Sequence, residues 1–344
     1  MKVQRPVVLA TCGEDGSVRV WSVPQGEQMM VLRGHQGMVR CLCWCPDGSG
    51  LLLTAGEDAT ARLWDVYNTL SGRGAGTCVK VVQGHTGPLT HVTFDVYGSV
   101  FATCSEDGTA MVWDSGTGTL VLALARLHRW WVSKAAFSPS GRTLTTASDD
   151  GTARVWDMVG DVEEPGECLH TLLWDSGQVN DVVYTPCGRF ILIATHMAAN
   201  PERECIVDPT DAKLLCYRIL MWSAVSGRIL RWHDGHMGII TRMAFRPKDR
   251  AASQRRQQEE EDDEEDFDTL ITTSLDGSFR EWEVMPEGGY DGKSRVEVAY
   301  FRGNRVKGRA EMGARARAAG YIRHNAGIYQ GAIFDACFTS KGDR

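Results

Sequence analysis

GEDGSVRVW, residues 13–21, is the first of five similar phrases that end in tryptophan. The others are GEDATARLW (56–64), SEDGTAMVW (105–113), SDDGTARVW (148–156) and SLDGSFREW (274–282). In each case an aspartate stands six residues before the tryptophan, and a threonine stands four residues before that aspartate. The first two of these tryptophans, Trp21 and Trp64, are 43 residues apart. Self-similarity at such a period predicts a chain built from one repeated supersecondary unit.

A second motif precedes most of these phrases and aligns on a histidine. It occurs as GHQGMVRCLCWCPDG (34–48), GHTGPLTHVTFDVYG (84–98), LHRWWVSKAAFSPSG (127–141) and GHMGIITRMAFRP (235–247). Each copy is a short alternating run that ends in an aromatic residue, and a glycine-rich turn follows most of them. A second run, an Asp-Gly turn and the tryptophan strand come next. The expected unit is therefore four short antiparallel strands, and the expected fold class is all-β.

These phrases resemble those of the WD-repeat β-propeller family. The Gly-His openings, the Thr–Asp–Trp spacing and the Trp-Asp pairs at Trp64, Trp113 and Trp156 carry the resemblance. It implies a closed propeller of four-stranded blades and covers nearly the whole chain, residues 1–344, as a single domain. The fold alone says little about function, because many roles share it.

The resemblance also gives the repeated polar residues a structural role. The histidine is implied to bond the threonine, the aspartate to hold the histidine side of the turn, and the indole to act as a donor. The members of this network are His35, Thr54, Asp58, Trp64, His85, Thr103, Asp107, Trp113, His128, Thr146, Asp150 and Trp156. A catalytic site needs one tuned constellation rather than several similar ones. We therefore expect no enzyme, no catalytic residue and no cofactor.

The two ends of the sequence complement each other as parts of one unit. VVLATCGEDGSVRVW (7–21) begins at a second strand, and IYQGAIFDACFTSKGDR (328–344) supplies a first strand. We expect the C-terminal strand to complete the N-terminal blade and close the ring, which hides edge strands from neighbours. Six blades are favoured, because residues 303–327 show neither strand alternation nor a tryptophan phrase, and seven blades remain the alternative.

CLCWCPDG (41–48) places Cys41, Cys43 and Cys45 at alternate positions and raises the question of a metal site. Side chains on one face of a strand are about 6.6 Å apart, whereas zinc thiolates lie about 2.3 Å from one ion. A straight strand does not bring three thiolates onto one metal, so we expect no metal. Cys43 aligns with small positions that suit burial, and Cys45 aligns with the exposed end of the strand.

The composition is that of a globular chain of 344 residues, 43% apolar and 24% charged. The net charge of −7 depends on the single run EEEDDEED (259–266) and says little about partners. No secretory signal and no apolar stretch long enough to span a membrane is visible. With 11 cysteines, far fewer than in a disulfide scaffold, we expect free thiols and an intracellular, cytoplasmic location. Nuclear, cytoskeletal or ciliary association stays open.

The resemblance places partner binding mostly at the rim where the first strands begin and in the central channel. One set of residues there is Arg40, Thr90, Ser133, Asn180, Thr241 and Phe334, and the second is Cys41, His91, Lys134, Asp181, Arg242 and Asp335. Trp130 replaces a glycine of the other units, and aromatic anchors are enriched in interface hot spots. We predict that Trp130 and the residues of these sets other than Cys41 bind a partner. Solvated rim residues and, for Trp130, local packing are the alternatives.

Three insertions interrupt the repeat: residues 197–213, the acidic segment 248–266 and the basic segment 303–327. The acidic run predicts a solvated loop, with a docking site for a basic partner as the alternative. The basic residues are Arg302, Arg305, Lys307, Arg309, Arg315, Arg317 and Arg323. They are candidates for contact with a polyanion such as an RNA backbone, although few aromatic residues interleave for base stacking.

The sequence as a whole favours a non-enzymatic scaffold or adaptor subunit of a larger intracellular assembly, with one or more protein partners. No membrane and no small-molecule substrate is expected. The main alternative is a ribonucleoprotein component that contacts RNA through residues 302–323. A third possibility is a substrate receptor of a ubiquitin ligase. Family members of that kind often carry Trp-Asp-x-Arg after the third strand, and WDVY (64–67), WDSG (113–116) and WDMV (156–159) lack the arginine.

Overall fold

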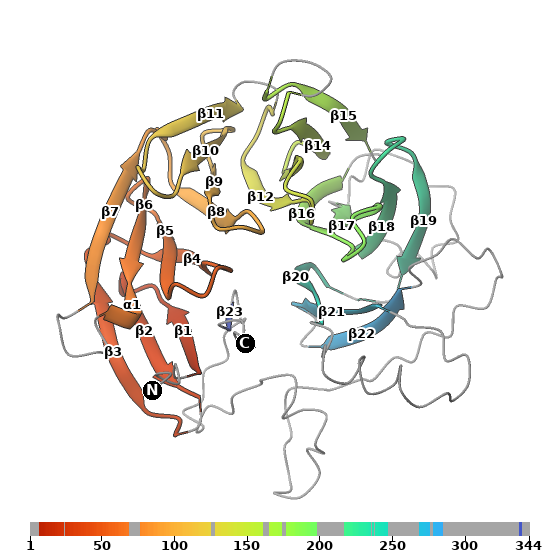
Figure 1. The fold of residues 1–344 in the computed structure, drawn as a ribbon. Coiled ribbons are helices and arrows are strands. Elements are labelled where there is room, and N and C mark those ends of the chain that lie inside the picture. Colours follow the sequence, from red (N-terminus) through yellow and green to blue (C-terminus); the bar gives the residue numbers. More distant parts are fainter. Residues whose placement is uncertain are drawn as a thin grey trace, which may run out of the picture.

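The description below rests on a computed structural model. It describes residues 7–23, 25–68, 76–124, 128–160, 165–173, 177–197, 217–234, 236, 238–246, 268–275, 278–284 and 337–338. Within these ranges the chain forms six antiparallel sheets arranged around a common centre (Figure 1). We call these sheets blades 1 to 6. The predicted all-β propeller of repeated blades is confirmed.

In each of the first three blades the strands are given in order from the centre of the ring outward. Blade 1 holds β23 (Cys337–Phe338), β1 (Val8–Cys12), β2 (Ser17–Ser22) and β3 (Gln28–Arg33). Blade 2 holds β4 (Val39–Trp44), β5 (Leu51–Gly56), β6 (Thr60–Asp65) and β7 (Thr77–Gln83), with the short helix α1 (Val66–Asn68) after β6. Blade 3 holds β8 (Leu89–Phe94), β9 (Val100–Ser105), β10 (Ala110–Asp114) and β11 (Leu120–Leu124).

The remaining blades follow the same order. Blade 4 holds β12 (Val132–Phe137), β13 (Thr143–Ser148), β14 (Thr152–Asp157) and β15 (Cys168–Leu173). Blade 5 holds β16 (Gly177–Tyr184), β17 (Phe190–Met197), β18 (Tyr217–Ser223) and β19 (Ile229–Asp234). Blade 6 holds β20 (Ile240–Phe245), β21 (Asp268–Ser274) and β22 (Phe279–Val284).

Two of the predicted insertions connect paired strands. Residues 198–216 join β17 to β18, and residues 247–267 lie between β20 and β21. Apart from Met197 at the end of β17, all three insertions lie outside the described residues. The same holds for the stretch 285–336. Whether the complete chain has six or seven blades therefore stays a prediction.

One cross-strand triplet recurs in every blade. In blade 2, Trp44 stands opposite Leu52, and Leu52 stands opposite Trp64. In blade 1, Phe338 stands opposite Leu9, and Leu9 opposite Trp21, which is the same register. The C-terminal strand thus pairs with β1 in the register that the other innermost strands keep with their neighbours. This confirms that it completes the N-terminal blade.

The hydrophobic core lies between the blades rather than within them. Trp113 belongs to blade 3, yet it packs in one cluster with Leu53 and Leu63 of blade 2. Each neighbouring pair of blades, from 1 and 2 to 5 and 6, shares such a cluster. Burying one leucine or valine side chain stabilises the folded state by about 1.5–3 kcal/mol. Each interface contributes this stability only when both blades are present, because each blade covers the side chains of the other.

A chain of hydrogen bonds anchors the tryptophan of blade 2. The Trp64 indole donates to Thr54 Oγ1 (2.9 Å), and Thr54 Oγ1 lies 2.8 Å from His35 Nε2. His35 Nδ1 lies 3.1 Å from Asp58 Oδ1. The Asp58 carboxylate also accepts the backbone N–H of Gln36 at 3.0 Å, which fastens the inner loop to the turn. These are the contacts that the family resemblance implies.

The same chain recurs in two more blades, and parts of it occur elsewhere. Its complete copies are Trp113–Thr103–His85–Asp107 in blade 3 and Trp156–Thr146–His128–Asp150 in blade 4. In blade 6 the indole of Trp282 donates to Thr272, which contacts His236. Blade 5 differs because Ile193 takes the threonine position opposite Leu220. Its tryptophan, Trp222, has a buried indole N–H without a hydrogen-bond partner among the described residues.

The protonation states follow from burial and hydrogen bonding. Burial lowers the pKa of His35 and of His85, although the neighbouring aspartate opposes this shift. Burial by itself raises the pKa of Asp58 and Asp107, but the hydrogen bonds from backbone and side-chain donors outweigh it and lower the pKa overall. At neutral pH the networks of blades 2 and 3 therefore each join a neutral imidazole to a carboxylate.

The three alternate cysteines share one face of β4 and its end. Cys41 and Cys45 are buried in the cluster between blades 2 and 3, and Cys43 is partly buried against it. The prediction of an exposed Cys45 is wrong, because the turn containing Gly98 of the next blade packs against its Sγ and leaves it 5% exposed. Burial raises the pKa of the Cys45 thiol to about 11. The thiols therefore act as apolar packing groups.

Two tryptophans in equivalent positions allow a matched test of the network. We expect Trp64→Phe to destabilise the protein by about 1–3 kcal/mol more than Trp222→Phe. Both changes remove a similar ring volume, but only Trp64 loses an indole hydrogen bond, to Thr54. Urea unfolding of the two variants measures the difference. Equal losses would show that the hydrogen bond adds nothing to the burial of the ring.

Acidification is expected to destabilise the fold in two stages. The folded-state pKa of His35 and His85 is lowered, so their contribution is complete above about pH 6.5 and declines as the pH falls below it. The lowered pKa of Asp58 and Asp107 gives stability that is complete above about pH 3.9 and is lost as the pH falls through their folded-state pKa. Urea midpoints measured from neutral to acid pH should show both stages. Replacing both histidines by asparagine should reduce the first stage without removing it, because burial also lowers the pKa of His91 and His196. A wild-type midpoint that is constant down to about pH 5 would contradict the first stage.

Candidate partner-binding surface

The first predicted set occupies one equivalent position in five blades. Along each innermost strand the pairing register shifts at one residue, a β-bulge, which re-aims a side chain. The residues at these bulges are Arg40, Thr90, Ser133, Asn180 and Thr241. Phe334, the sixth member, lies outside the described residues.

Three of these side chains tie neighbouring blades together. The Thr90 hydroxyl donates to the Val132 carbonyl of blade 4, and the Ser133 hydroxyl donates to the Val179 carbonyl of blade 5 at 2.7 Å. Arg40 forms ion pairs with Glu57 of its own blade, at 2.9 Å, and with Glu106 of blade 3.

The other two side chains bond within their own blade. The Asn180 amide donates to His196 Nδ1 at 2.8 Å, and Thr241 Oγ1 lies 2.9 Å from Thr273 Oγ1. Each of the five described side chains in this set therefore already has a hydrogen-bond or ion-pair partner within the protein.

The second predicted set converges on the central channel. Lys134 Nζ lies 3.1 Å from Asp181 Oδ2, and Arg242 Nη1 lies 3.3 Å from His91 Nε2. The His91–Arg242 contact joins blade 3 to blade 6 across the centre, because β8 and β20 face each other there (Figure 1). Asp335, the remaining predicted member, lies outside the described residues.

Burial sets the charge of this channel cluster. His91 is 5% exposed and Asp181 1% exposed. Burial, reinforced by the positive charges of Arg242 and Lys134, holds the pKa of His91 well below its usual range. The expectation of solvated rim residues is therefore wrong for His91 and Asp181. Their placement disfavours a direct role in binding and favours the cohesion of blades 3 to 6.

Trp130 is the predicted residue that the structure leaves most accessible. Its side chain is 65% exposed, and that of Trp131 beside it is 47% exposed. Their loop is fixed by its backbone, because the Trp131 carbonyl accepts the Asp149 N–H at 3.0 Å and the Trp130 carbonyl accepts the Ser148 hydroxyl. Local packing therefore does not account for Trp130. Two adjacent indoles project from a well-tethered loop.

Sequence reasoning missed Trp131, since most other blades have an apolar residue at its position: Met38, Pro88 and Ile239, with Gln178 as the exception. The doublet Trp-Trp was the available signal. The seven basic residues between Arg302 and Arg323 lie outside the described residues, so their proposed polyanion contact stays a prediction.

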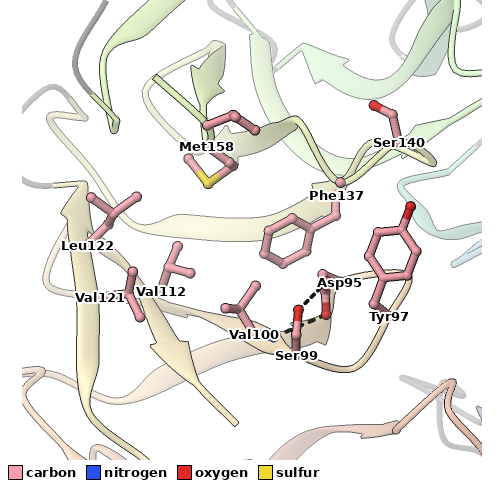
Figure 2. A pocket seen from close by; sticks show the side chains of 12 residues that line it. Asp95, Tyr97, Ser99, Val100, Val112, Val121, Leu122, Phe137, Ser140 and Met158 are labelled. Atoms are coloured by element: carbon pink, nitrogen blue, oxygen red, sulfur yellow. Dashed lines mark hydrogen bonds between the residues drawn. The ribbon is translucent and has the colours of Figure 1, made fainter. Parts of the chain in front are cut away.

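A groove at the opposite end of β12 also escaped the sequence analysis. Its volume is about 280 Å³, and it opens between blades 3 and 4. Figure 2 shows Val121 and Leu122 of β11 at one side, Tyr97 at the other, and Phe137 and Met158 across from them. The lining is mostly apolar. The uncharged run LVLAL (120–124) was the signal available in the sequence.

Two general searches cover the described part of the chain. No three or more His, Cys, Asp or Glu side chains there are grouped so as to hold a metal ion. None of the helices in those ranges is long and apolar enough to cross a membrane.

Comparison with known families agrees with the repeat architecture. The model of the WD domain, G-beta repeat family matches the chain four times, at residues 5–22, 26–65, 76–114 and 121–157. These matches run from β1 to β14, through blades 1 to 3 and the first three strands of blade 4. Blades 5 and 6 extend the same architecture in the structure although the family model does not match them.

Individual relatives match over short stretches. A WD repeat and SOCS box-containing protein 1 of Danio rerio is 34% identical over 118 residues, 34% of this chain and 26% of the relative. The DENN domain and WD repeat-containing protein SCD1 of Arabidopsis thaliana is 31% identical over 111 residues, 32% of this chain and 8% of the relative. The nuclear distribution protein PAC1 of Arthroderma benhamiae is 30% identical over 148 residues, 38% of this chain and 32% of the relative. The chain thus spans less than a third of the length of each of these relatives.

The channel ion pair predicts a large effect of one substitution. We expect Asp181→Ala to destabilise the protein by about 3–5 kcal/mol, because it leaves the buried Lys134 ammonium without its carboxylate. The double change Lys134→Met with Asp181→Ala should recover part of that loss, since no uncompensated charge remains. Urea unfolding measures both. A single-variant loss below about 1 kcal/mol would show that the pair behaves like a solvent-exposed one.

Proposed function

The chain belongs to the WD-repeat family, and on that premise we propose that it is a non-enzymatic scaffold subunit of a larger assembly. In this proposal a protein partner docks on the loop surface that carries Trp130 and Trp131. The other loops at that end of the blades have Gly37, Gly87, Gly177 or Gly238 where blade 4 has Trp130. The surface is therefore specific to one place in an otherwise repeated ring.

The exposure of the two indoles is the observation that carries the proposal. A tryptophan buries 150–250 Å² of surface on docking, and interface hot spots are enriched in this residue. Here two adjacent indoles lie largely in solvent at 65% and 47% exposure. Their loop is held by backbone hydrogen bonds to Ser148 and Asp149, so little ordering of the loop is needed when a partner binds.

The arrangement of the repeated polar residues supports a non-enzymatic role. In each complete His–Thr–Asp–Trp network the side-chain donors and acceptors hydrogen-bond to one another within one blade. Burial keeps the pKa of His35 and His85 low, and the imidazole edges face Thr and Asp rather than a cavity. These contacts fit structural cohesion of the blades.

The proposed setting is a reducing, intracellular compartment, in which the free thiols of the described cysteines are stable. Binding of RNA through residues 302–323 and a substrate-receptor role are the competing functions from the sequence. No contact among the described residues favours either one. The experiment below includes an arm that detects RNA dependence.

Loss of the exposed indole is expected to weaken partner capture without unfolding the ring. Trp130→Ala should reduce recovery of protein partners from native extract about tenfold or more, as expected for a hot-spot residue worth at least 1.4 kcal/mol. Its melting temperature should stay within about 2 °C of wild type, because the side chain is 65% exposed. Tagged pull-down with and without nuclease, read by mass spectrometry, measures recovery.

Trp232→Ala is the matched control, since Trp232 is 53% exposed on the outer strand β19. Its partner recovery should equal that of wild type. Partners that disappear with nuclease would move the function to the basic segment and refute the scaffold reading. A large fall in melting temperature for Trp130→Ala would make Trp130 a packing residue instead.

A further inference from the structure

The outermost strand of blade 3 differs chemically from the other outer strands. The strands β3, β7, β15 and β19 each include at least one side chain from the set Arg, Lys and His. β11 reads Leu-Val-Leu-Ala-Leu and has no polar side chain at all. Proteins commonly protect exposed strand edges with charges, especially lysine, because an uncharged edge invites pairing with another strand.

One position shows this contrast directly. In blade 2, Lys80 of β7 pairs with Leu63, and in blade 3, Leu122 of β11 pairs with Val112 at the equivalent place. The Lys80 ammonium donates to the Ser115 carbonyl of blade 3 at 3.0 Å, whereas Leu122 lines the groove. β11 is the outermost strand of its sheet, and among the described residues no other strand pairs with its outer side. Its outward backbone groups are available as donors and acceptors.

The groove begins at this edge. Val121 and Leu122 line one side of the 280 Å³ cavity, and Phe137 and Met158 of blade 4 line the side across from it (Figure 2). Exposed apolar side chains gather around its mouth, among them Tyr97 at 68% and Val121 at 51% exposure. Contiguous apolar patches of this kind on a folded protein mark interaction sites.

No charged side chain that lines the groove is accessible to a partner. Asp95 is its one charged lining residue, and its carboxylate is 4% exposed. That carboxylate accepts the Ser99 hydroxyl at 2.9 Å and the Val100 N–H at 3.1 Å within its own turn. The chemical complement of this edge and groove is therefore an uncharged segment with free backbone groups and at least one apolar side chain.

We propose that β11 and this groove form a second docking surface, which takes an extended, uncharged segment of a partner protein as an added strand and holds one of its apolar side chains. Strand addition of this kind gains affinity from main-chain hydrogen bonds and specificity from a side-chain pocket. A second copy of this chain fits less well, because the Val121 and Leu122 side chains of its β11 already line its own groove.

This surface lies apart from the proposed indole surface. Trp131 directly precedes β12, whereas Phe137 at the end of β12 lines the groove. A six-residue strand spans about 20 Å. The two surfaces thus lie at opposite ends of blade 4, and partners on both can be bound at once.

The test uses the full-length protein and six synthetic peptides with an uncharged, extended core. Their central residue is Val, Leu, Ile, Met, Phe or Trp, and binding is measured by fluorescence anisotropy. Val121→Lys places a charge on the edge, and Val79→Lys is its matched control. Val79 is 45% exposed and stands at the same register shift of β7, between Cys78 and Lys80. Both variants should keep the wild-type melting temperature; if Val121→Lys does not, Ala123→Lys, at another exposed position of β11, replaces it.

We expect at least one peptide to bind wild type and Val79→Lys equally and to bind Val121→Lys about tenfold more weakly or not at all. N-methylation of its strand-facing amides should abolish binding, and hydrogen exchange should show new protection of residues 120–124. Lack of binding by all six peptides, or equal binding to both lysine variants, would overturn the proposal. Wild-type self-association in sedimentation that Val121→Lys removes would also overturn it, since a second copy would then cover β11. None of these outcomes depends on Trp130, so the two surfaces are tested separately.

Discussion

The structure depends on the fact that no blade can bury its own faces. A four-stranded sheet has two faces, and in this chain the aromatic and aliphatic side chains of one face are covered only by the next blade, as Trp113 is by Leu53 and Leu63. The triplet of an inner aromatic, a central apolar residue and a tryptophan, such as Trp44, Leu52 and Trp64, recurs at the same register in each sheet. The His–Thr–Asp–Trp chains then hold the loops at one end of the strands. Packing between blades thus decides the architecture, and the hydrogen bonds stabilise its ends.

Positions at which one blade departs from the repeat can be compared directly with the equivalent positions of the other blades. Trp130 stands where other blades have glycine, Leu122 where blade 2 has Lys80, and Ile193 where other blades have threonine. The third departure removes a buried acceptor and leaves the Trp222 indole unsatisfied, which is a cost in stability with no evident gain. The first leaves an indole 65% exposed just before β12, and the second lines the groove between blades 3 and 4.

The channel shows how polar residues that differ between blades can serve the ring itself. Lys134, Asp181, His91 and Arg242 come from four inner strands. Lys134 pairs with Asp181 of the next blade, and His91 pairs with Arg242 across the centre. Burying such groups is costly unless each finds a partner. A network that depends on four blades at once fixes their mutual positions, and so keeps the two proposed docking surfaces at a constant separation.

The sequence by itself determined the repeat, the all-β class, the four-stranded unit and the pairing of the C-terminal strand with the first blade. It did so because the strand period, the turn residues and the Thr–Asp–Trp spacing are local signals that recur at a fixed interval. Only the tertiary structure decided which polar positions face solvent. Cys45 was expected at an exposed strand end and is covered by the turn around Gly98 of the next blade, and His91 is 5% exposed and contacts Arg242 from across the ring. The exposed Trp131 and the groove beside β11 were also decided there, because burial depends on what the neighbouring blade places against a residue, and residues distant in sequence supply that cover.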